Sequence, residues 1–166
     1  MNPDPLKIFI VAGEPSGDLH GGKLIRAIQS IEPNSSFMGH GGDSMKNTGM
    51  QILEHVDTLT MMGFSEVIRH LPKMIRIMTK TIETINRVKP DRIILIDYPG
   101  FNLRLAKKIQ NLNIPITYFI LPQAWAWKEK RVEILKNYVE QSLCIFPFEQ
   151  KASHQWQQGS YLIPLV

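Results

Sequence analysis

Short apolar runs alternate in this chain with segments of helical spacing, and no other feature of the sequence limits the fold as strongly. The first run, residues 7 to 11, is rich in β-branched and aromatic side chains and is closed by Gly13, which predicts a buried strand. Apolar residues then recur at helical intervals from Asp18 to Ser30. A glycine-rich turn therefore joins a predicted strand to a predicted helix.

This unit of strand, turn and helix recurs along the chain. A second strand is predicted at Ser36 to Met38, ends at the glycines of residues 39 to 42, and is followed by a short helix from Asp43. The apolar run from Arg92 to Ile96 ends in a carboxylate and precedes a helix at residues 103 to 109. The same patterns predict further strands at 116–121, 142–146 and 161–163, and further helices at 131–137 and 149–157.

The alternation predicts an α/β fold: a doubly wound, mostly parallel, Rossmann-like sheet with helices on both faces. The length of 166 residues predicts a single domain, 1–166, with a core of ordinary size. Ligands of such sheets bind outside the carboxyl ends of the strands. We therefore expect the functional side chains in the turns that directly follow strands.

Composition excludes several classes of protein. Hydrophobic residues make up 43% of the chain and charged residues 20%, and no apolar run is long enough to cross a bilayer. The first residues lack the basic and apolar pattern of a secretory signal, so a cytoplasmic location is expected. The single cysteine, Cys144, excludes an internal disulfide and a cysteine metal cluster, and we predict that it is a small core residue.

The turn after the first predicted strand combines glycines with alternating polar side chains. Glycines allow a ligand close to the backbone, and the N-terminus of the following helix favours an anion or polar oxygens. Ser16 or Asp18 alternatively caps that helix, and capping is compatible with binding. The candidate binding residues of this turn are Glu14, Ser16, Gly17, Asp18 and His20.

Residues 17 to 23 match the phosphate-binding pattern G-x-x-x-x-G-K, but two observations argue against a P-loop. Leu24 stands where a serine or threonine would bind magnesium, and the match begins several residues after the strand instead of at its end. The dinucleotide pattern G-x-G-x-x-G is also absent from this turn, which argues against a nicotinamide enzyme.

Asp97 directly follows a strand of consecutive apolar residues. Desolvation at that position would raise the pKa of its carboxyl and suit it to accept a proton from a hydroxyl. A carboxylate that accepts hydrogen bonds from a neighbouring turn is the alternative, and the sequence leaves both interpretations open.

An amide and two indoles, those of Gln123, Trp125 and Trp127, follow the strand predicted at 116–121. Aromatic faces commonly pack against sugar rings or lipid, so this segment is a candidate binding site. Tryptophans two positions apart are equally compatible with a place in the core.

The positive charge of the chain is concentrated in residues 61 to 89. Six basic residues and two acidic ones stand there, and the difference equals the net charge of +4 of the whole chain. Apolar residues recur every three or four positions in the same segment, which predicts two consecutive helices separated at Pro72. A basic surface with apolar residues favours association with anionic lipid, whereas a methionine-rich stripe is often part of the core.

Taken together, these segments resemble one family, the lipid-A-disaccharide synthases, which are inverting glycosyltransferases of lipopolysaccharide assembly in Gram-negative bacteria. Each matching segment is weakly specific alone, but six in the family's order are highly specific. They cover nearly the whole chain and are AGEPSGDLHG (12–21), GHGGDSM (39–45), MGFSEVIRHLP (62–72), IDYPGFNLRLAKK (96–108), LPQAWAWKEKRV (121–132) and LCIFPFE (143–149).

The resemblance implies a reaction in lipid A biosynthesis. A 2,3-diacylglucosamine unit passes, with inversion, from its UDP derivative to the 6-hydroxyl of 2,3-diacylglucosamine 1-phosphate. The resemblance implies a GT-B fold of two nucleotide-fold domains, of which this chain is similar to the N-terminal, acceptor-side one. It implies no metal, cofactor or nucleic acid. Because both substrates carry acyl chains, it implies a cytoplasmic protein that is peripherally associated with the inner membrane.

The resemblance also implies roles for individual residues. Asp97 matches the aspartate that is proposed as the family's general base. The implied substrate-binding residues are Glu14, Ser16, Gly17, Asp18, His20, Gly41, Gly42, Met62, Gly63, Asn102, Gln123, Trp125 and Trp127. An apolar surface for acyl chains or the bilayer would comprise Phe64, Val67, Ile68, Leu71, Met74, Ile75 and Met78.

The chain departs from the family pattern at its end. Family members continue from the last strand of this domain through a Gly-His-Pro-Leu segment into a donor-binding C-terminal domain, whereas residues 161 to 166 lack the Gly-His. We therefore expect that the donor domain is absent and that the chain alone binds acceptor with little or no turnover. A non-catalytic module that binds lipid or nucleotide sugar is the alternative. The expected partner is a separate C-terminal domain or a second copy of the chain.

Overall fold

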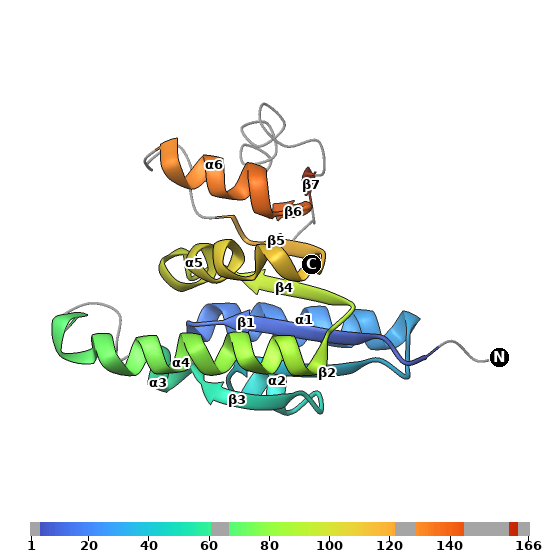
Figure 1. The fold of residues 1–166 in the computed structure, drawn as a ribbon. Helices are drawn as coiled ribbons and strands as arrows, with labels where there is room; N and C mark the ends of the chain where they lie inside the picture. The colour runs from blue at the N-terminus through green and yellow to red at the C-terminus, as the bar shows by residue number, and fades with distance from the viewer. Residues whose placement is uncertain (1–3, 61–66, 122–128, 145–159, 163–166) are drawn as a thin grey trace.

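The computed structural model describes residues 4–60, 67–121, 129–144 and 160–162 (Figure 1). The strands of these ranges form one seven-stranded sheet in the order β3-β2-β1-β4-β5-β6-β7, and every neighbouring pair is parallel. The strands are β1 Lys7–Ala12, β2 Ser36–Gly41, β3 Gln51–His55, β4 Arg92–Ile96, β5 Ile116–Phe119, β6 Gln141–Cys144 and β7 Ser160–Leu162. The chain builds outward from β1 to β3 and then crosses back to β4, so the strand order reverses beside β1.

Helices connect the strands and cover both faces of the sheet (Figure 1). A short 3₁₀ turn, Gln110–Leu112, extends the fifth of them. The helices are α1 Pro15–Ile31, α2 Asp43–Lys46, α3 Val56–Thr60, α4 Val67–Val88, α5 Pro99–Ile109 and α6 Glu129–Tyr138.

The two faces of the sheet bury separate apolar clusters. Alternate residues of β1 point to opposite faces, so Ile8 and Ile10 pack with Ile25 of α1 and with α2. Phe9 and Val11 instead pack with α4, α5 and α6. The predicted fold class is confirmed, because a parallel sheet lies between two layers of helices.

Most predicted elements lie within a few residues of their observed bounds. The helix predicted at 149–157 and the side chain of Cys144 lie outside the described part of the chain. Strand β3 and helix α3 were not predicted, because residues 51 to 60 carry no continuous apolar run. Among the described helices, none is long and apolar enough to cross a membrane.

Strand β2 continues through residues 39 to 41, where a break was predicted. Gly39 has a φ of +139°, and a Cβ at that position would collide with the backbone carbonyl of Ile10. The register of β3 shifts at the same point, between residues 39 and 40. Glycine therefore permits close contact between β1 and β2 instead of ending the strand.

Helix α4 is continuous, although two helices separated at Pro72 were predicted. Pro72 lies in the second turn of the helix, where its missing N–H removes one hydrogen bond. Further along, Ile77, Met78 and Ile85 are buried against the sheet. This burial stabilises the helix enough to offset the missing bond.

Candidate functional site

Two turns meet at the carboxyl edge of the sheet, one after β1 and one after β4. The strands pair in parallel with Ala12 opposite Ile96, so the next residues, Gly13 and Asp97, are neighbours. Glu14 follows Gly13 and precedes α1. The strand order reverses between β1 and β4, and ligands of α/β sheets bind at such a reversal.

Asp97 and Tyr98, which we call the Asp97 turn, both have left-handed backbone conformations. Their φ angles are 44° and 45°, a region that costs a non-glycine residue about 1 kcal/mol or more. The Asp97 N–H donates to the Phe119 carbonyl at 3.0 Å, and the Tyr98 carbonyl accepts from the N–H groups of Phe101 and Asn102 at 3.2 and 3.1 Å. The surrounding hydrogen bonds thus hold a strained turn, and such strain is concentrated at functional sites.

Three titratable side chains at this edge have raised pKa values. Burial raises the pKa of the Asp97 carboxyl, although a hydrogen bond from the Tyr98 backbone opposes the rise. Burial also raises the pKa of Glu14, and the negative charge of Asp97 adds to that rise. The Tyr98 hydroxyl has a raised pKa because of its burial and, to a smaller extent, the charge of Glu14. The carboxylates are therefore stronger bases than solvated ones.

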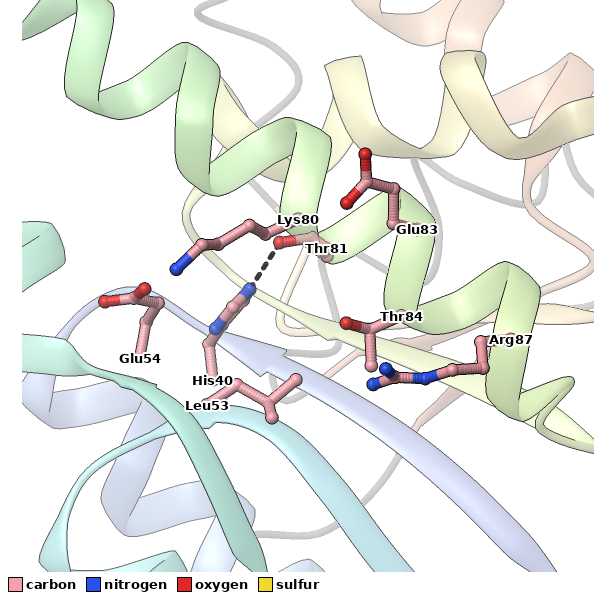
Figure 2. Close-up of a pocket in the computed structure, with 8 residues that line it drawn as sticks. All are labelled: His40, Leu53, Glu54, Lys80, Thr81, Glu83, Thr84 and Arg87. Carbon is pink, nitrogen blue, oxygen red and sulfur yellow. Dashed lines mark hydrogen bonds between the residues drawn. The ribbon is translucent and has the colours of Figure 1, made fainter.

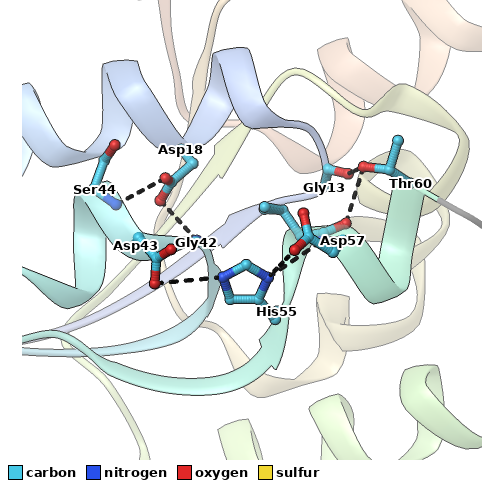
Figure 3. Close-up of polar contacts among 9 residues, drawn as sticks. Gly13, Asp18, Gly42, Asp43, Ser44, His55, Asp57 and Thr60 are labelled. Atoms are coloured by element: carbon cyan, nitrogen blue, oxygen red, sulfur yellow. Dashed lines mark hydrogen bonds and ion pairs between the residues drawn. The ribbon is translucent and has the colours of Figure 1, made fainter.

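Gly13 leaves room for the ring of Tyr98. A Cβ at Gly13 would collide with that ring, which stacks on Phe101 with 6.0 Å between centroids. The Tyr98 hydroxyl lies 3.4 Å from the Leu59 carbonyl, to which it donates. The Thr60 hydroxyl shares its hydrogen between the Val56 carbonyl at 2.9 Å and the Gly13 carbonyl at 3.1 Å (Figure 3). These contacts attach helix α3 to the site.

Asp18 occupies a place other than the one predicted for it. Asp18 is 6% exposed, and its carboxylate accepts hydrogen bonds from the backbone N–H groups of Gly42 and Ser44 at 2.7 and 2.9 Å (Figure 3). The backbone N–H of Met45 donates to the same carboxylate at 3.1 Å. These N–H groups belong to the start of α2, so Asp18 caps a distant helix instead of its own. Asp18 therefore has a structural role at the start of α2, and its contact with substrate stays a prediction.

The other polar candidates of the first turn lie at or inside the start of α1. The helix begins at Pro15, three residues before the predicted start, and the side chain of the preceding Glu14 makes no capping hydrogen bond. Ser16 is exposed. His20 is half-buried, and its ring meets Phe119 edge to face with 6.2 Å between centroids. Glu14 and His20 therefore remain available beside the ends of β1 and β5.

The glycines of α1 serve helix packing. A Cβ at Gly17 would lie 3.3 Å from the Cβ of Ala12, and one at Gly21 would collide with Met45. Residues 17 to 23 are helical throughout, so they do not form the loop that a P-loop requires. Gly17 makes close contact with the sheet, and its contact with substrate stays a prediction.

Gly41 and Gly42 also belong to the packing between α1, β2 and α2. A Cβ at Gly41 would collide with Met45, and one at Gly42 would lie 2.8 Å from a carboxylate oxygen of Asp18. Both glycines are buried. Both glycines thus permit close packing within the fold, and their contact with substrate stays a prediction.

Asn102 is 0% exposed and lies under the Asp97 turn. Its side-chain amide donates to the Asp97 carbonyl at 2.8 Å. Asn102 thus contacts the backbone of the site, and its contact with substrate stays a prediction.

The exposed face of α4 retains part of the predicted apolar surface. Leu71 is 47% exposed and Ile75 is 58% exposed. Met74 is partly buried against the core, and Met78, only 8% exposed, belongs to it. Met78 thus lies on the side of the helix that packs against the core, and the surface for acyl chains or the bilayer stays a prediction.

Several predicted residues lie outside the described ranges. They are Met62, Gly63, Phe64, Gln123, Trp125 and Trp127, together with the side chains of Val67 and Ile68.

A cavity of about 430 Å³ lies between α4 and strands β2 and β3 (Figure 2). Its lining includes His40, whose Nε2 lies 2.7 Å from the Thr81 hydroxyl. That hydroxyl donates to the Ile77 carbonyl at 2.7 Å, so Nε2 carries the proton and donates to Thr81. Burial lowers the pKa of His40 to about 4, which leaves the ring neutral at pH 7. None of the residues that line the cavity belongs to the Asp97 turn.

His40 was not singled out from the sequence, because its partner Thr81 lies 41 positions away. Within the described ranges, no three His, Cys, Asp or Glu side chains are placed to hold a metal ion. The carboxylates at the ends of β1 and β4 are thus the chemically distinctive groups at the carboxyl edge.

Comparison with known proteins gives matches over most of the chain. The family model described as lipid-A-disaccharide synthetase matches residues 8–157. The lipid-A-disaccharide synthase of Myxococcus xanthus is 40% identical over 147 residues, which are 89% of this chain and 38% of the relative. That of Coxiella burnetii is 36% identical over 144 residues, 87% of this chain and 38% of the relative. The chain therefore spans less than two-fifths of the length of these relatives.

Solved structures with similar folds share little sequence with the chain. A UDP-GlcNAc 2-epimerase from Neisseria meningitidis, bound to UDP-GlcNAc, has a TM-score of 0.60 at 9% sequence identity. The match covers 95% of this chain and 44% of the epimerase chain. MurG from Acinetobacter baumannii has a TM-score of 0.61 at 10% identity and matches 96% of this chain and 45% of its own. These likenesses establish the fold, which is that of one half of a GT-B protein.

Proposed function

The chain belongs to the lipid-A-disaccharide synthase family, and we propose that it is the acceptor-binding part of that glycosyltransferase. The proposed reaction transfers diacylglucosamine from its UDP derivative to the 6-hydroxyl of diacylglucosamine 1-phosphate. The chain spans 38% of the length of its relative from Myxococcus xanthus, so we assign the UDP site to the remainder of such a protein. Either a covalently attached segment or a separate domain would supply it.

The state of the Asp97 carboxylate carries the proposal. It stands at the carboxyl end of β4, in a strained turn, and its pKa is raised by burial. A carboxylate that serves the fold accepts several hydrogen bonds, as Asp18 does. A carboxylate that is poorly solvated and beside a second carboxylate is suited to take a proton.

The proposed step has one proton transfer and one displacement. The acceptor's 6-hydroxyl oxygen forms a bond to the anomeric carbon of the donor sugar while its proton passes to the Asp97 carboxylate. The bond between that carbon and the UDP oxygen breaks, and UDP leaves with the electron pair. Attack opposite the leaving group inverts the anomeric configuration. Glu14 and His20 lie at the same edge and would bind hydroxyl or amide groups of the acceptor.

The test uses a protein that holds both halves of the active site. Residues 1–166 are fused to the segment of the Myxococcus xanthus relative that follows its matched region, and disaccharide and UDP are measured together. Substitution Asp97→Asn removes the proton acceptor and should lower turnover about 100-fold or more. Asp57→Asn is the control, because the side chain of Asp57 is 75% exposed and pairs only with His55 among described residues.

Two outcomes separate the alternatives. Near-normal turnover of the Asp97→Asn fusion would contradict the role of general base. A fusion that binds acceptor and makes no disaccharide, even without substitution, would instead support a binding module that lacks transfer chemistry.

We further propose that the exposed face of α4 contacts acyl chains or the surface of the inner membrane. Leu71 and Ile75 are exposed large apolar residues one helical turn apart, and the exposed Lys73 and Arg76 stand beside them. Basic side chains near an apolar stripe favour anionic lipid. The proposal therefore places the protein at the cytoplasmic face of that membrane, without a spanning segment.

Flotation with phosphatidylglycerol-containing vesicles tests this surface. The double substitution Leu71→Ser and Ile75→Ser should release most of the bound protein, because each loses apolar area in contact with lipid. The matched control is Leu19→Ser with Ile31→Ser, which alters exposed apolar residues of α1 that are 51% and 78% exposed. Equal flotation of both double variants would refute the surface.

A further inference from the structure

The carbonyl of Asp97 accepts two hydrogen bonds from buried side chains. Tyr118 of β5 donates its hydroxyl hydrogen at 2.6 Å, and Asn102 of α5 donates from its amide at 2.8 Å. Both donors are 0% exposed. We call these two side chains the carbonyl clamp. They lie beneath the turn that carries the proposed base, and neither faces solvent.

Asn102 also connects the turn to the two strands before it. Its amide nitrogen lies 3.2 Å from the Ile96 carbonyl and 3.4 Å from the Val11 carbonyl. An amide nitrogen has two hydrogens, so they are shared among the ends of β1, β4 and the turn. The position of Asp97 is thereby tied to the strand that carries Gly13 and Glu14.

The oxygen of the Asn102 amide shows that this residue is not present for packing alone. Its Oδ1 is buried and has no hydrogen-bond partner among the described residues. An unpaired buried acceptor is unfavourable, and an apolar side chain of similar size would avoid that cost. The reversed amide is excluded, because Oδ1 would then face three carbonyl oxygens. Donation to those carbonyls is therefore the distinctive contribution of Asn102.

The clamp acts on the strained part of the backbone. Asp97 and Tyr98 are consecutive left-handed residues without the freedom of glycine, and such a conformation persists only where its surroundings hold it. With its carbonyl fixed from below by two donors, the Asp97 side chain is directed from a defined Cα at the carboxyl edge. Relaxation of the turn would move the carboxylate relative to the acceptor site.

We propose that Asn102 and Tyr118 are positioning residues that set the orientation of the Asp97 carboxylate for proton transfer. This inference rests on the proposed function of Asp97 as general base. Misplacement of a catalytic group lowers turnover more than substrate binding. The loss should appear in kcat, while KM for the acceptor stays nearly unchanged.

Tyr118→Phe in the fused enzyme is the principal test, because it removes the hydroxyl and keeps the buried ring. We expect kcat to fall about tenfold with KM within about twofold. The matched control is Tyr138→Phe, a tyrosine of α6 that packs partly buried against the same core cluster. A loss confined to KM, or an equal loss in the control, would overturn the proposal.

A double-mutant cycle with Asp97→Asn distinguishes positioning from general destabilisation. If Tyr118 acts through Asp97, Tyr118→Phe should cause no further loss of kcat in the Asp97→Asn background. The same fold-loss in both backgrounds would overturn the proposal. Asn102→Ala is the second variant of the clamp, and its loss should likewise vanish in the Asp97→Asn background.

A measurement without turnover keeps this inference separate from the proposed function. The side-chain carboxyl of Asp97 is titrated by carbon-13 NMR in the 166-residue chain and in its Tyr118→Phe variant. We expect the raised pKa of Asp97 to move toward its ordinary value when the turn is released. An unchanged pKa would overturn the positioning role. Near-normal turnover of Asp97→Asn would instead refute the general base, and the role of the clamp in proton transfer would fall with it.

Discussion

Asp18 and Asp97 are two partly or fully buried carboxylates that the fold treats in opposite ways. Asp18 accepts three backbone N–H groups at the start of α2, at distances between 2.7 and 3.1 Å. Asp97 sits in a left-handed turn, and burial raises its pKa against the opposition of one backbone hydrogen bond. The first carboxylate is solvated by the protein, and the second is poorly solvated.

The difference distinguishes a carboxylate with a structural role, that of Asp18, from a carboxylate with a proposed catalytic role, that of Asp97. The hydrogen bonds that Asp18 accepts satisfy the open end of a helix. The backbone around Asp97 is instead supported through its carbonyl, by Asn102 and Tyr118, while its carboxylate accepts a hydrogen bond from the Tyr98 backbone. Burial alone therefore does not distinguish the two roles, whereas the partners of each oxygen do.

The largest effect is expected when Asp18 is removed. Asp18→Ala leaves three N–H groups of α2 without their acceptor, and two of them belong to the buried residues Gly42 and Met45. We expect the free energy of unfolding to fall by about 4 kcal/mol, measured by urea denaturation at pH 7.5. Asp43→Ala, at a side chain that is 83% exposed, is the control. A loss for Asp18→Ala no larger than that of the control would remove the structural half of the comparison.

A smaller effect is expected when the space around the Asp97 turn is filled. Gly13→Ala places a methyl group in collision with the Tyr98 ring, so we expect a loss of about 2 kcal/mol in unfolding free energy. Gly100→Ala is the matched control, because Gly100 is in α5 and a Cβ there meets nothing within 4 Å. The control should be neutral or gain up to about 1 kcal/mol. Equal stability of the two variants would show that the turn tolerates a shift of Tyr98.

The sheet was predictable from the sequence because burial on both faces produces continuous apolar runs. Residues 92 to 96 form such a run and are strand β4 as predicted. The break predicted at Gly39 was wrong, because a glycine marks either a turn or a close approach of two backbones, and only the neighbouring strand decides which. The break predicted at Pro72 was also wrong, because burial further along α4 outweighs the one hydrogen bond that proline removes.

The site was predictable in position but only partly in detail. Parallel strands place the residues after β1 and β4 together, so Glu14 and Asp97 meet as the alternation implied. The cap that Asp18 provides depends on N–H groups more than 20 positions away, which no local pattern reports. The left-handed Asp97 turn was equally hidden, because neither Asp97 nor Tyr98 is a glycine.

The smallest expected change in stability is also the most direct test of the contrast between the two carboxylates. The pKa of the Asp97 carboxyl is higher in the folded chain than its value of about 3.9 in the unfolded chain. The stability that its protonation contributes is therefore complete below about pH 3.9, and it is lost as the pH rises through the folded-state pKa. The ionised carboxylate thus opposes folding at pH 7.5, and asparagine tolerates a left-handed backbone well. The unfolding free energy of the Asp97→Asn variant at pH 7.5 should equal or exceed that of the parent, with the gain absent at about pH 3. A loss of about 1 kcal/mol or more at pH 7.5 would contradict the account, because Asp97 would then stabilise the fold as Asp18 does.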